Sequence, residues 1–396
     1  MIPRHLSRHL RRDAGYYPIV TLTGPRQSGK TTLARATFPD YAYVSLEDFD
    51  HREFAVEDPR GFLARYPESV IIDEAQRAPE LFSYLQTAVD EKDQPGRFIL
   101  TGSQNLLLME RISQSLAGRS SILHLLPLSR SELERQEPPS TDNPLEIFAN
   151  STSALDCWKM IHNGFYPRLH ERGIPPEIWL KDYLRTYVER DVRSLVNVGD
   201  HETFERFLRL CAGRTGQLLN FAALGSDAGI AADTARRWIS VLKTSFLVFL
   251  LRPHHENFNK RLIKSPKLYF YDTGLACALL GIRTKDQLFT HPLRGALFEN
   301  MVVSEVVKAY THDRREPPIS FWRDRTGHEV DLLLEEAGKL YPVEMKSGST
   351  VKGSHLEGLQ FWHRLTGTPV EHCTLVHSGS ANHQRQGFWI RPWFGV

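Results

Sequence analysis

Cysteine is scarce in this sequence of 396 residues, which holds only four. Because Cys157, Cys211, Cys277 and Cys373 lie far apart, the chain has no CxxC pair and no other zinc-binding spacing. A disulfide framework is not expected in a chain of this length. The sequence therefore predicts a protein of the reducing cytoplasm.

Long apolar runs are also missing. The longest of note, Phe246–Leu251, has six residues, whereas a membrane-spanning helix needs about 18. The first 12 residues contain four arginines, and no apolar stretch like that of a signal peptide follows them. We therefore expect neither export nor insertion into a membrane.

A large net charge is the third missing feature, since 49 Lys and Arg residues face 47 Asp and Glu residues, giving +2. The average hides local clusters. Arg4, Arg8, Arg11 and Arg12 lie in one N-terminal segment, and residues 236–267 carry a net charge of +7, so the remainder carries −9. A uniformly basic protein is excluded, and any surface for nucleic acid must be local.

The length predicts two or three domains, at about 100 to 200 residues each. We assign them to residues 1–135, 150–285 and 290–396, with a Pro-rich linker at 134–144. In the first domain, expected strands alternate with helices, which predicts an α/β fold with a mainly parallel sheet covered on both faces. The middle domain is predicted to be helical and the last to be mixed α/β. The strands expected in the first domain are Tyr17–Thr23, Tyr43–Leu46, Ser69–Ile72, Arg97–Thr101 and Ile122–Leu126.

A phosphate-binding motif follows the first expected strand. Residues 24–31 read Gly-Pro-Arg-Gln-Ser-Gly-Lys-Thr and fit the pattern GxxxxGK(S/T). Its glycines let backbone N–H groups point at phosphate oxygens, and the next helix adds its positive end. Lys30 is expected to reach the β- and γ-phosphates of ATP, and the Thr31 hydroxyl to ligate Mg²⁺. The expected nucleotide contacts are Gly24, Pro25, Arg26, Gln27, Ser28, Gly29, Lys30, Thr31 and Thr32.

Two acids end the expected strand Ser69–Ile72 and supply the carboxylates that ATP hydrolysis needs. Asp73 is expected to hold the Mg²⁺ shell, and Glu74 to polarise the attacking water as general base. Alone, this pair would more often be two solvated acids after a buried strand. Beside a phosphate loop it favours hydrolysis over storage of nucleotide.

Polar residues elsewhere in the first domain are candidates for further catalytic roles. Ser103 or Gln104, after the strand Arg97–Thr101, would position water near the γ-phosphate, unless they form an ordinary turn. Arg119 would stabilise transition-state charge, in cis or from a neighbouring subunit. A solvated surface arginine is an equal alternative, and action in trans would require a homo-oligomer.

The middle domain has a candidate nucleic-acid surface. Helical patterns at 217–224 and 233–244, joined by a glycine-bearing turn, match a helix-turn-helix, and residues 259–271 are plausible as the hairpin of a winged helix. The basic segment 236–267 would then hold a DNA or RNA backbone. The alternative is a module that packs against protein, within this chain or in a partner.

Near the C-terminus, two strand-like runs carry Asp331, Glu344 and Lys346. Alternation along the second strand places Glu344 and Lys346 on one face, and Asp331 on an adjacent strand would complete a Mg²⁺ site with Lys346 near the nucleophilic water. Glu299, on an expected helix, is a further candidate ligand. The alternative is a salt-bridged pair of strands.

With these motifs in place, the sequence resembles a bacterial and archaeal family of ATPases in which an AAA-like P-loop domain precedes a C-terminal domain of unknown function. The resemblance implies a winged helix in the middle and a restriction-endonuclease-like fold at the end, whose PD-(D/E)XK pattern falls on Asp331, Glu344 and Lys346. Val330 replaces the Pro of that pattern. The motifs that carry the resemblance are Thr23–Thr31, Val70–Glu74, Leu100–Ser103, Leu116–Arg119, Leu126–Ser129, Tyr187–Asp191, Arg214–Leu218, Lys264–Tyr269, Asp272–Gly274 and Gly295–Asn300.

The leading hypothesis is a Mg²⁺-dependent ATPase whose nucleotide state controls a winged-helix and nuclease-like module acting on nucleic acid. The alternative is a nucleotide-controlled switch or binding protein with an inactive nuclease-like scaffold, acting through a protein partner or DNA. The expected cofactors are ATP and Mg²⁺ in both.

Overall fold

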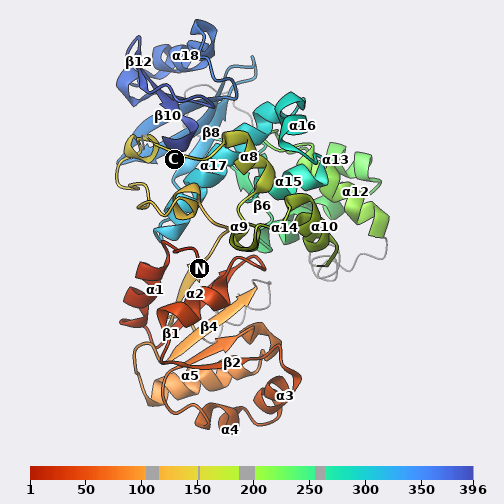
Figure 1. Ribbon diagram of the computed structural model, residues 1–396, viewed down its shortest axis with the longest axis vertical. Coiled ribbons are helices and arrows are strands. Elements are labelled where there is room, and N and C mark those ends of the chain that lie inside the picture. The colour runs from red at the N-terminus through yellow and green to blue at the C-terminus, as the bar shows by residue number, and fades with distance from the viewer. Residues whose placement is uncertain (104–115, 150–151, 187–200, 255–263, 396) are drawn as a thin grey trace.

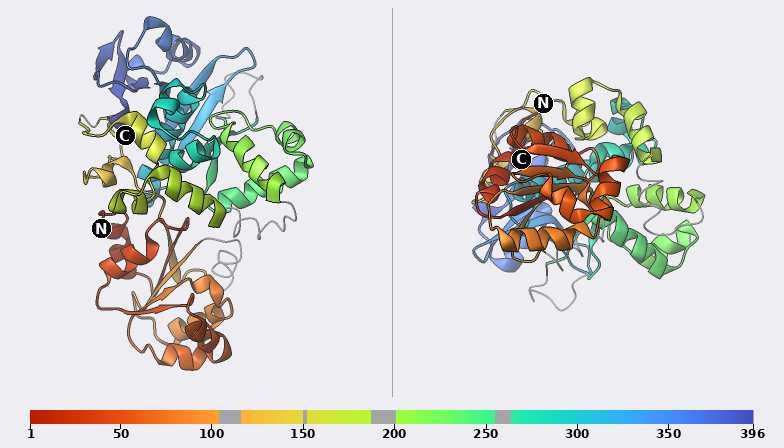
Figure 2. Two further views of the ribbon diagram at one scale, coloured as in Figure 1. Left: turned by 45° about the vertical axis from the view of Figure 1, so that its right-hand side comes forward. Right: turned by 90° about the horizontal axis from the view of Figure 1, so that it is seen from below.

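The computed structural model describes residues 1–103, 116–149, 152–186, 201–254 and 264–395. An N-terminal α/β part and a C-terminal α/β part lie at opposite ends of the long axis, and a helical middle part lies between and beside them (Figures 1 and 2). The four cysteines are buried free thiols. No helix in the described ranges combines the length and apolar character that a membrane span requires.

The N-terminal part is built on five parallel strands in the order β2-β3-β4-β1-β5. The predicted parallel α/β sheet is confirmed, and each strand begins and ends within one or two residues of its expected position. The strands are β1 (Ile19–Gly24), β2 (Ala42–Ser45), β3 (Val70–Asp73), β4 (Phe98–Ser103) and β5 (Ser120–His124).

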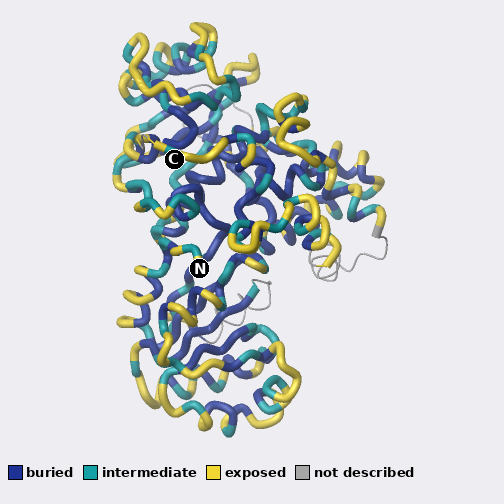
Figure 3. Tube along the Cα trace, viewed as in Figure 1, coloured by how far each residue is buried: buried dark blue, intermediate teal, exposed yellow. Residues whose placement is uncertain are grey.

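Helices cover both faces of this sheet because alternate residues of its buried strands point to opposite sides. Ile19, Ile72 and Leu100 pack with helices α3 to α5 on one face. Val20 and Ile71 pack with α1 and α2 on the other. The helices are α1 (Ser7–Ala14), α2 (Lys30–Thr37), α3 (Phe49–Glu57), α4 (Pro59–Ala64) and α5 (Leu81–Glu91). Figure 3 shows the strands buried between more exposed helices.

The middle part is mainly helical and contains one antiparallel strand pair, β6 with β7. Asn220 caps α13, and Gly229 ends it in a left-handed conformation with φ of 77°. A helix pair followed by a hairpin is therefore present, and its winged-helix character stays a prediction. The elements after the first sheet are α7 (Arg130–Leu133), α8 (Cys157–Asn163), α9 (Pro167–Arg172), α10 (Pro176–Tyr183), α12 (His201–Ala212), α13 (Phe221–Ala228), α14 (Ala232–Thr244), β6 (Val248–Leu251), β7 (Lys267–Phe270), α15 (Thr273–Leu279) and α16 (Lys285–Thr290).

The C-terminal part has a mixed sheet of six strands in the order β12-β13-β11-β10-β9-β8. Helix α17 precedes the antiparallel run β8 to β10, and α18 connects β10 to its parallel neighbour β11. A separate α/β unit is present, and its nuclease-like class stays a prediction. Its elements are α17 (Arg294–His312), β8 (Ile319–Arg323), β9 (Glu329–Glu336), β10 (Lys339–Lys346), α18 (Glu357–Thr366), β11 (Thr374–His377), β12 (His383–Arg385) and β13 (Phe388–Pro392).

One hydrophobic core joins the middle and C-terminal parts. It includes Phe207 from the middle part, Val302 and Val343 from the C-terminal part, and Leu128 from the segment that leaves the N-terminal sheet. The boundary predicted near residues 285–290 therefore separates two patterns of secondary structure that share a core.

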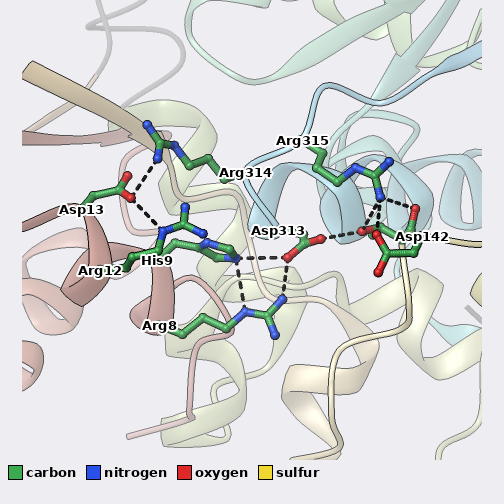
Figure 4. Close-up of polar contacts among 9 residues, drawn as sticks. Arg8, His9, Arg12, Asp13, Asp142, Asp313, Arg314 and Arg315 are labelled. Carbon is green, nitrogen blue, oxygen red and sulfur yellow. Dashed lines mark hydrogen bonds and ion pairs between the residues drawn. The ribbon is translucent and has the colours of Figure 1, made fainter. Parts of the chain in front are cut away.

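Charged side chains join α1 to the end of α17 (Figure 4). The buried carboxylate of Asp13 accepts from Arg314 Nη1 at 2.8 Å. Asp313 accepts from Arg8 Nη2 at 2.5 Å, and Arg12 Nε also donates to Asp13, at 3.2 Å. Two exposed arginines of the N-terminal basic cluster, Arg8 and Arg12, are thus paired with carboxylates of the same chain.

His312, in the last turn of α17, is buried beside Glu132. Burial lowers the pKa of His312 from its ordinary 6.5 to about 3, although the charge of Glu132 opposes this shift. The ring is therefore neutral at pH 7, so the 3.6 Å contact between its Nδ1 and Glu132 Oε1 is not an ion pair.

We expect the protein to lose stability as the pH falls below about 6.5, because the unfolded chain binds a proton at His312 that the folded chain excludes. The free energy of unfolding should fall by up to about 1.4 kcal/mol per pH unit from this residue. Urea unfolding at several pH values measures the slope. His312→Gln should flatten it, whereas the exposed control His383→Gln should not; equal slopes for H312Q and wild type would contradict the assignment.

Candidate functional site

The phosphate loop connects β1 to α2 at the carboxyl edge of the N-terminal sheet. Gly24, Gln27 and Gly29 have φ values of 149°, 64° and 93°. A Cβ atom on Gly24 would lie 2.2 Å from the backbone oxygen of Leu125. Glycine is therefore required at position 24 both by its backbone conformation and by the close approach of the neighbouring chain.

Lys30, the first residue of α2, is turned back onto the loop. Its Nζ donates to the backbone oxygens of Gly24 at 3.1 Å and Pro25 at 2.8 Å. Burial lowers the pKa of Lys30 to about 8, against the opposing charges of Glu74 and Asp73. A phosphate in the loop would offer this ammonium a charged partner in place of two carbonyls.

Asp73 is the meeting point of three hydroxyl groups and is 8% exposed. It accepts from Thr31 Oγ1 at 2.9 Å, from Tyr43 Oη at 3.1 Å, and from Thr101 Oγ1. In the sheet, β4 lies between β1, which leads into the phosphate loop, and β3, which carries Asp73. Thr101 of β4 fills that interval. Adjacent hydroxyl and carboxylate oxygens at Thr31 and Asp73 suit Mg²⁺.

Glu74 follows β3 in a left-handed conformation, with φ of 54°. Gln76 Nε2 donates both to Glu74 Oε2 and, at 3.2 Å, to Ser103 Oγ. One amide thus brings the predicted base and the predicted water-positioning hydroxyl together, whereas Gln104 lies outside the described residues. The conformation of Glu74 is uncommon for a residue with a side chain and costs about 1 kcal/mol or more.

Arg119 lies at the opposite edge of the sheet from the phosphate loop. Its backbone oxygen accepts from Ile19 at the start of β1, whereas the loop begins at the end of that strand. Its guanidinium holds Asp90 through two hydrogen bonds, of 2.6 and 2.9 Å. The structure therefore does not bring Arg119 to the loop in cis, and action from another subunit stays a prediction.

Residues from outside the sheet cover the loop. Arg4 donates to the backbone oxygen of Ser28 at 2.6 Å, and Tyr183 of α10 donates to that of Arg26 at 3.3 Å. Ser28 Oγ is buried and has no hydrogen-bond partner within the part of the chain that the structure describes, and Thr32 is exposed on α2. The loop therefore lies where the N-terminal segment and the middle part meet it.

Arg4, Tyr43, Gln76 and Thr101 were missed in the sequence. Only Thr101 carried a usable signal, as a polar residue at the end of a buried strand.

A second constellation lies at the C-terminal sheet, where the structure brings Asp331, Glu344 and Lys346 together. Asp331 Oδ2 accepts from the Met345 N–H at 2.9 Å, and Lys346 Nζ donates to Glu344 Oε1 at 2.5 Å. Burial, together with the charge of Asp331, raises the pKa of Glu344 to about 8, while Lys346 opposes the shift. Glu299 belongs to the same cluster: burial raises its pKa to about 7, although Lys267 lowers it.

The metal-binding role of Asp331, Glu344 and Glu299 stays a prediction. Among the described residues, no group of three or more His, Cys, Asp or Glu side chains is placed to hold a metal ion. Glu299 instead accepts from Lys267 Nζ at 2.9 Å and Tyr269 Oη at 2.5 Å. The ammonium group of Lys267 thus lies beside a carboxylate that the prediction assigned to Mg²⁺.

The nucleic-acid surface expected at 236–267 stays a prediction. Lys267 is buried, Arg236 pairs with Asp233 at 3.0 Å, and residues 255–263 lie outside the described part. A different cationic surface is present beside Lys346. There, Lys346 lines an open pocket together with Arg294, Lys352 and His355.

Three family models match consecutive parts of the chain: an AAA domain at residues 16–134 and domains of unknown function at 155–286 and 294–393. Two relatives, the uncharacterized proteins Rv2008c of Mycobacterium tuberculosis and Mb2031c of Mycobacterium bovis, are 32% identical over 351 residues, which is 88% of this chain and 74% of theirs. A solved structure, the Walker-type ATPase PABY2304 of Pyrococcus abyssi, is 17% identical, with 70% of this chain and 96% of that chain covered and a TM-score of 0.40. At that score the match carries no weight for domain arrangement.

We expect Gly24→Ala to destabilise the protein more than Gly338→Ala. Both glycines have positive φ, but only Gly24 would place its new methyl group against backbone, since nothing lies within 4 Å of a Cβ at Gly338. The difference in unfolding free energy should be about 1 to 3 kcal/mol. Urea unfolding of both variants measures it, and equal losses would contradict the close approach at Leu125.

Proposed function

We propose, from the premise that this chain belongs to the same family as the two mycobacterial proteins and carries an AAA domain at residues 16–134, that it binds ATP with Mg²⁺ and hydrolyses it. One observation carries the proposal: the hydrogen bond from Thr31 to Asp73 joins the phosphate loop to the acidic end of β3 across an intervening strand. Those two residues would hold Mg²⁺, which when bound neutralises phosphate charge.

The chain's own groups supply the remaining chemistry. The backbone N–H groups of the loop and the start of α2 would bind the phosphates, and Lys30 would exchange its two carbonyl partners for phosphate oxygens. Glu74 would accept the proton of the attacking water. Gln76, which donates to both Glu74 and Ser103, would hold the Glu74 carboxylate in place.

The same site supports a switch. The backbone oxygens of Ser28 and Arg26 accept hydrogen bonds from Arg4 and Tyr183. A change in the backbone conformation of the loop on nucleotide binding would therefore alter its contacts with the N-terminal segment and α10. We propose that this is how nucleotide state reaches the middle and C-terminal parts.

Two roles remain for the C-terminal part. The open pocket lined by the cations Lys346, Arg294 and Lys352, together with His355, supports a module that acts on nucleic acid. The ammonium of Lys267, which faces Glu299, Glu329 and Asp331, favours an inactive scaffold. On this observation we favour a nucleotide-controlled switch that acts through DNA or a protein partner.

We expect Lys30→Ala to abolish ATP binding, and Glu74→Gln to retain binding while turnover falls about 100-fold or more. Turnover is measured as phosphate release in Mg²⁺, and binding with a fluorescent ATP analogue. The exposed residues Lys339 and Glu57 offer matched controls, Lys339→Ala and Glu57→Gln, which should behave as wild type. Unchanged ATP turnover in both K30A and E74Q would contradict the ATPase proposal.

For the C-terminal part, we expect the full chain in Mg²⁺ or Mn²⁺ to nick supercoiled DNA no faster than Asp331→Ala or Lys346→Ala. The physical reason is that the ammonium group of Lys267 holds the carboxylate oxygens that a metal ion would need. An ammonium group cannot bind and activate a water molecule as a metal ion does. Nicking by wild type that disappears in both variants would establish the nuclease role instead.

A further inference from the structure

The side chain of Lys267 crosses from the middle part into the C-terminal part. It extends from β7 and is 2% exposed. Its Nζ lies 2.9 Å from Glu299 Oε1 on α17 and 2.5 Å from Glu329 Oε1 at the start of β9. Asp331 Oδ1, two residues further along β9, is 4.0 Å away. One ammonium group therefore faces three carboxylates from two elements of another part of the chain.

The chemistry of an ammonium group suits this position. It has three N–H donors and no acceptor, so it can serve several carboxylates at once. Buried carboxylates without a cation are strongly unfavourable, and a buried lysine without an acid is equally so. Tyr269, two residues along β7, adds a hydroxyl donor to Glu299 at 2.5 Å. The strand thus presents two donors to one face of α17.

Glu344 extends the cluster on β10. Its Oε1 accepts from Lys346, while its Oε2 is buried and has no hydrogen-bond partner among the described residues. Arg323 pairs with Glu329 Oε2 at 3.0 Å. We define the carboxylate cluster as Glu299, Glu329, Asp331 and Glu344. It faces three cations, and removal of Lys267 would leave two of its four carboxylates without a counter-charge.

A divalent metal does not fit the cluster as it stands. Mg²⁺ binds carboxylate oxygens at about 2.0 to 2.1 Å, and Lys267 already engages Glu299 and Glu329 at ion-pair distance. No three acidic side chains in the described ranges converge on one point at ligand spacing.

We infer that the ammonium group of Lys267 is the resident cation of the carboxylate cluster, that it takes the place of a divalent metal ion, and that it thereby docks the β6–β7 pair onto the C-terminal part. The inference does not depend on ATP chemistry, since none of these residues lies at the phosphate loop. It predicts that removing the lysine creates a metal site from the four carboxylates.

The test is Mn²⁺ binding to the full chain without nucleotide, followed by electron paramagnetic resonance of free Mn²⁺. Lys267→Met should gain one Mn²⁺ that the double variant Lys267→Met/Asp331→Asn loses. Wild type and Asp331→Asn should bind equally, and this comparison cancels any Mn²⁺ held at Asp73. Lys264→Met, an exposed lysine in the same segment, is the matched control and should gain nothing.

Thermal unfolding keeps the inference testable if Lys267→Met folds poorly. Mn²⁺ should then raise the melting temperature of K267M but not that of K267M/D331N, and Glu299→Gln should partly restore stability to K267M by removing one unpaired charge. Two results would overturn the inference: a Mn²⁺ bound by wild type and lost in D331N, or a folded K267M that binds no more Mn²⁺ than wild type. Neither result bears on ATP turnover.

Discussion

The buried ion pair between Arg4 and Glu132 is the interaction on which the placement of the phosphate loop depends. Arg4 Nε lies 3.1 Å from Glu132 Oε1, and its two terminal nitrogens donate to the backbone oxygens of Ser28 and Leu126. The guanidinium presents its donors in a rigid fork, so one side chain fixes the loop, the end of the sheet and α7 relative to one another. Because Glu132 is fully buried, a movement that breaks the pair leaves a charge uncompensated. The loop backbone at Ser28 is therefore not free to move alone.

Helix α17 extends this constraint to the other end of the molecule. Its 19 residues span about 28 Å. His312 in its last turn lies beside Glu132, and Lys308 donates to the backbone oxygen of Leu128 at 3.0 Å. Glu299 near its start accepts from Lys267. A single helix thus contacts both the segment that holds the loop and the carboxylate cluster. A displacement of α17 at one end would therefore change its contacts at the other end.

The parts of the site that the sequence predicted are those encoded by contiguous residues. The phosphate loop is a local backbone motif, and Asp73 and Glu74 follow directly from a buried strand. Thr101 was missed because its role comes from strand order, with β4 placed between β1 and β3. For Lys267 the sequence left two environments open, a nucleic-acid surface or a contact with protein, and could not decide between them for a similar reason. The partners of this lysine lie 32 or more residues away in sequence, and no local pattern shows which carboxylates a lysine will meet.

Local charge is the clearest case in which a sequence feature changes meaning on folding. A cluster of arginines or lysines predicts a basic surface only if its members remain in water, because a buried cation must be matched by acids. Arg4 and Lys267 are both buried and pair with carboxylates distant in the chain. Each such pair removes one positive charge from the candidate surface and one negative charge from the remainder. The total of 49 basic and 47 acidic residues therefore cannot locate a cationic surface, because a cation buried in an ion pair, such as Lys267 on β7, does not contribute to one.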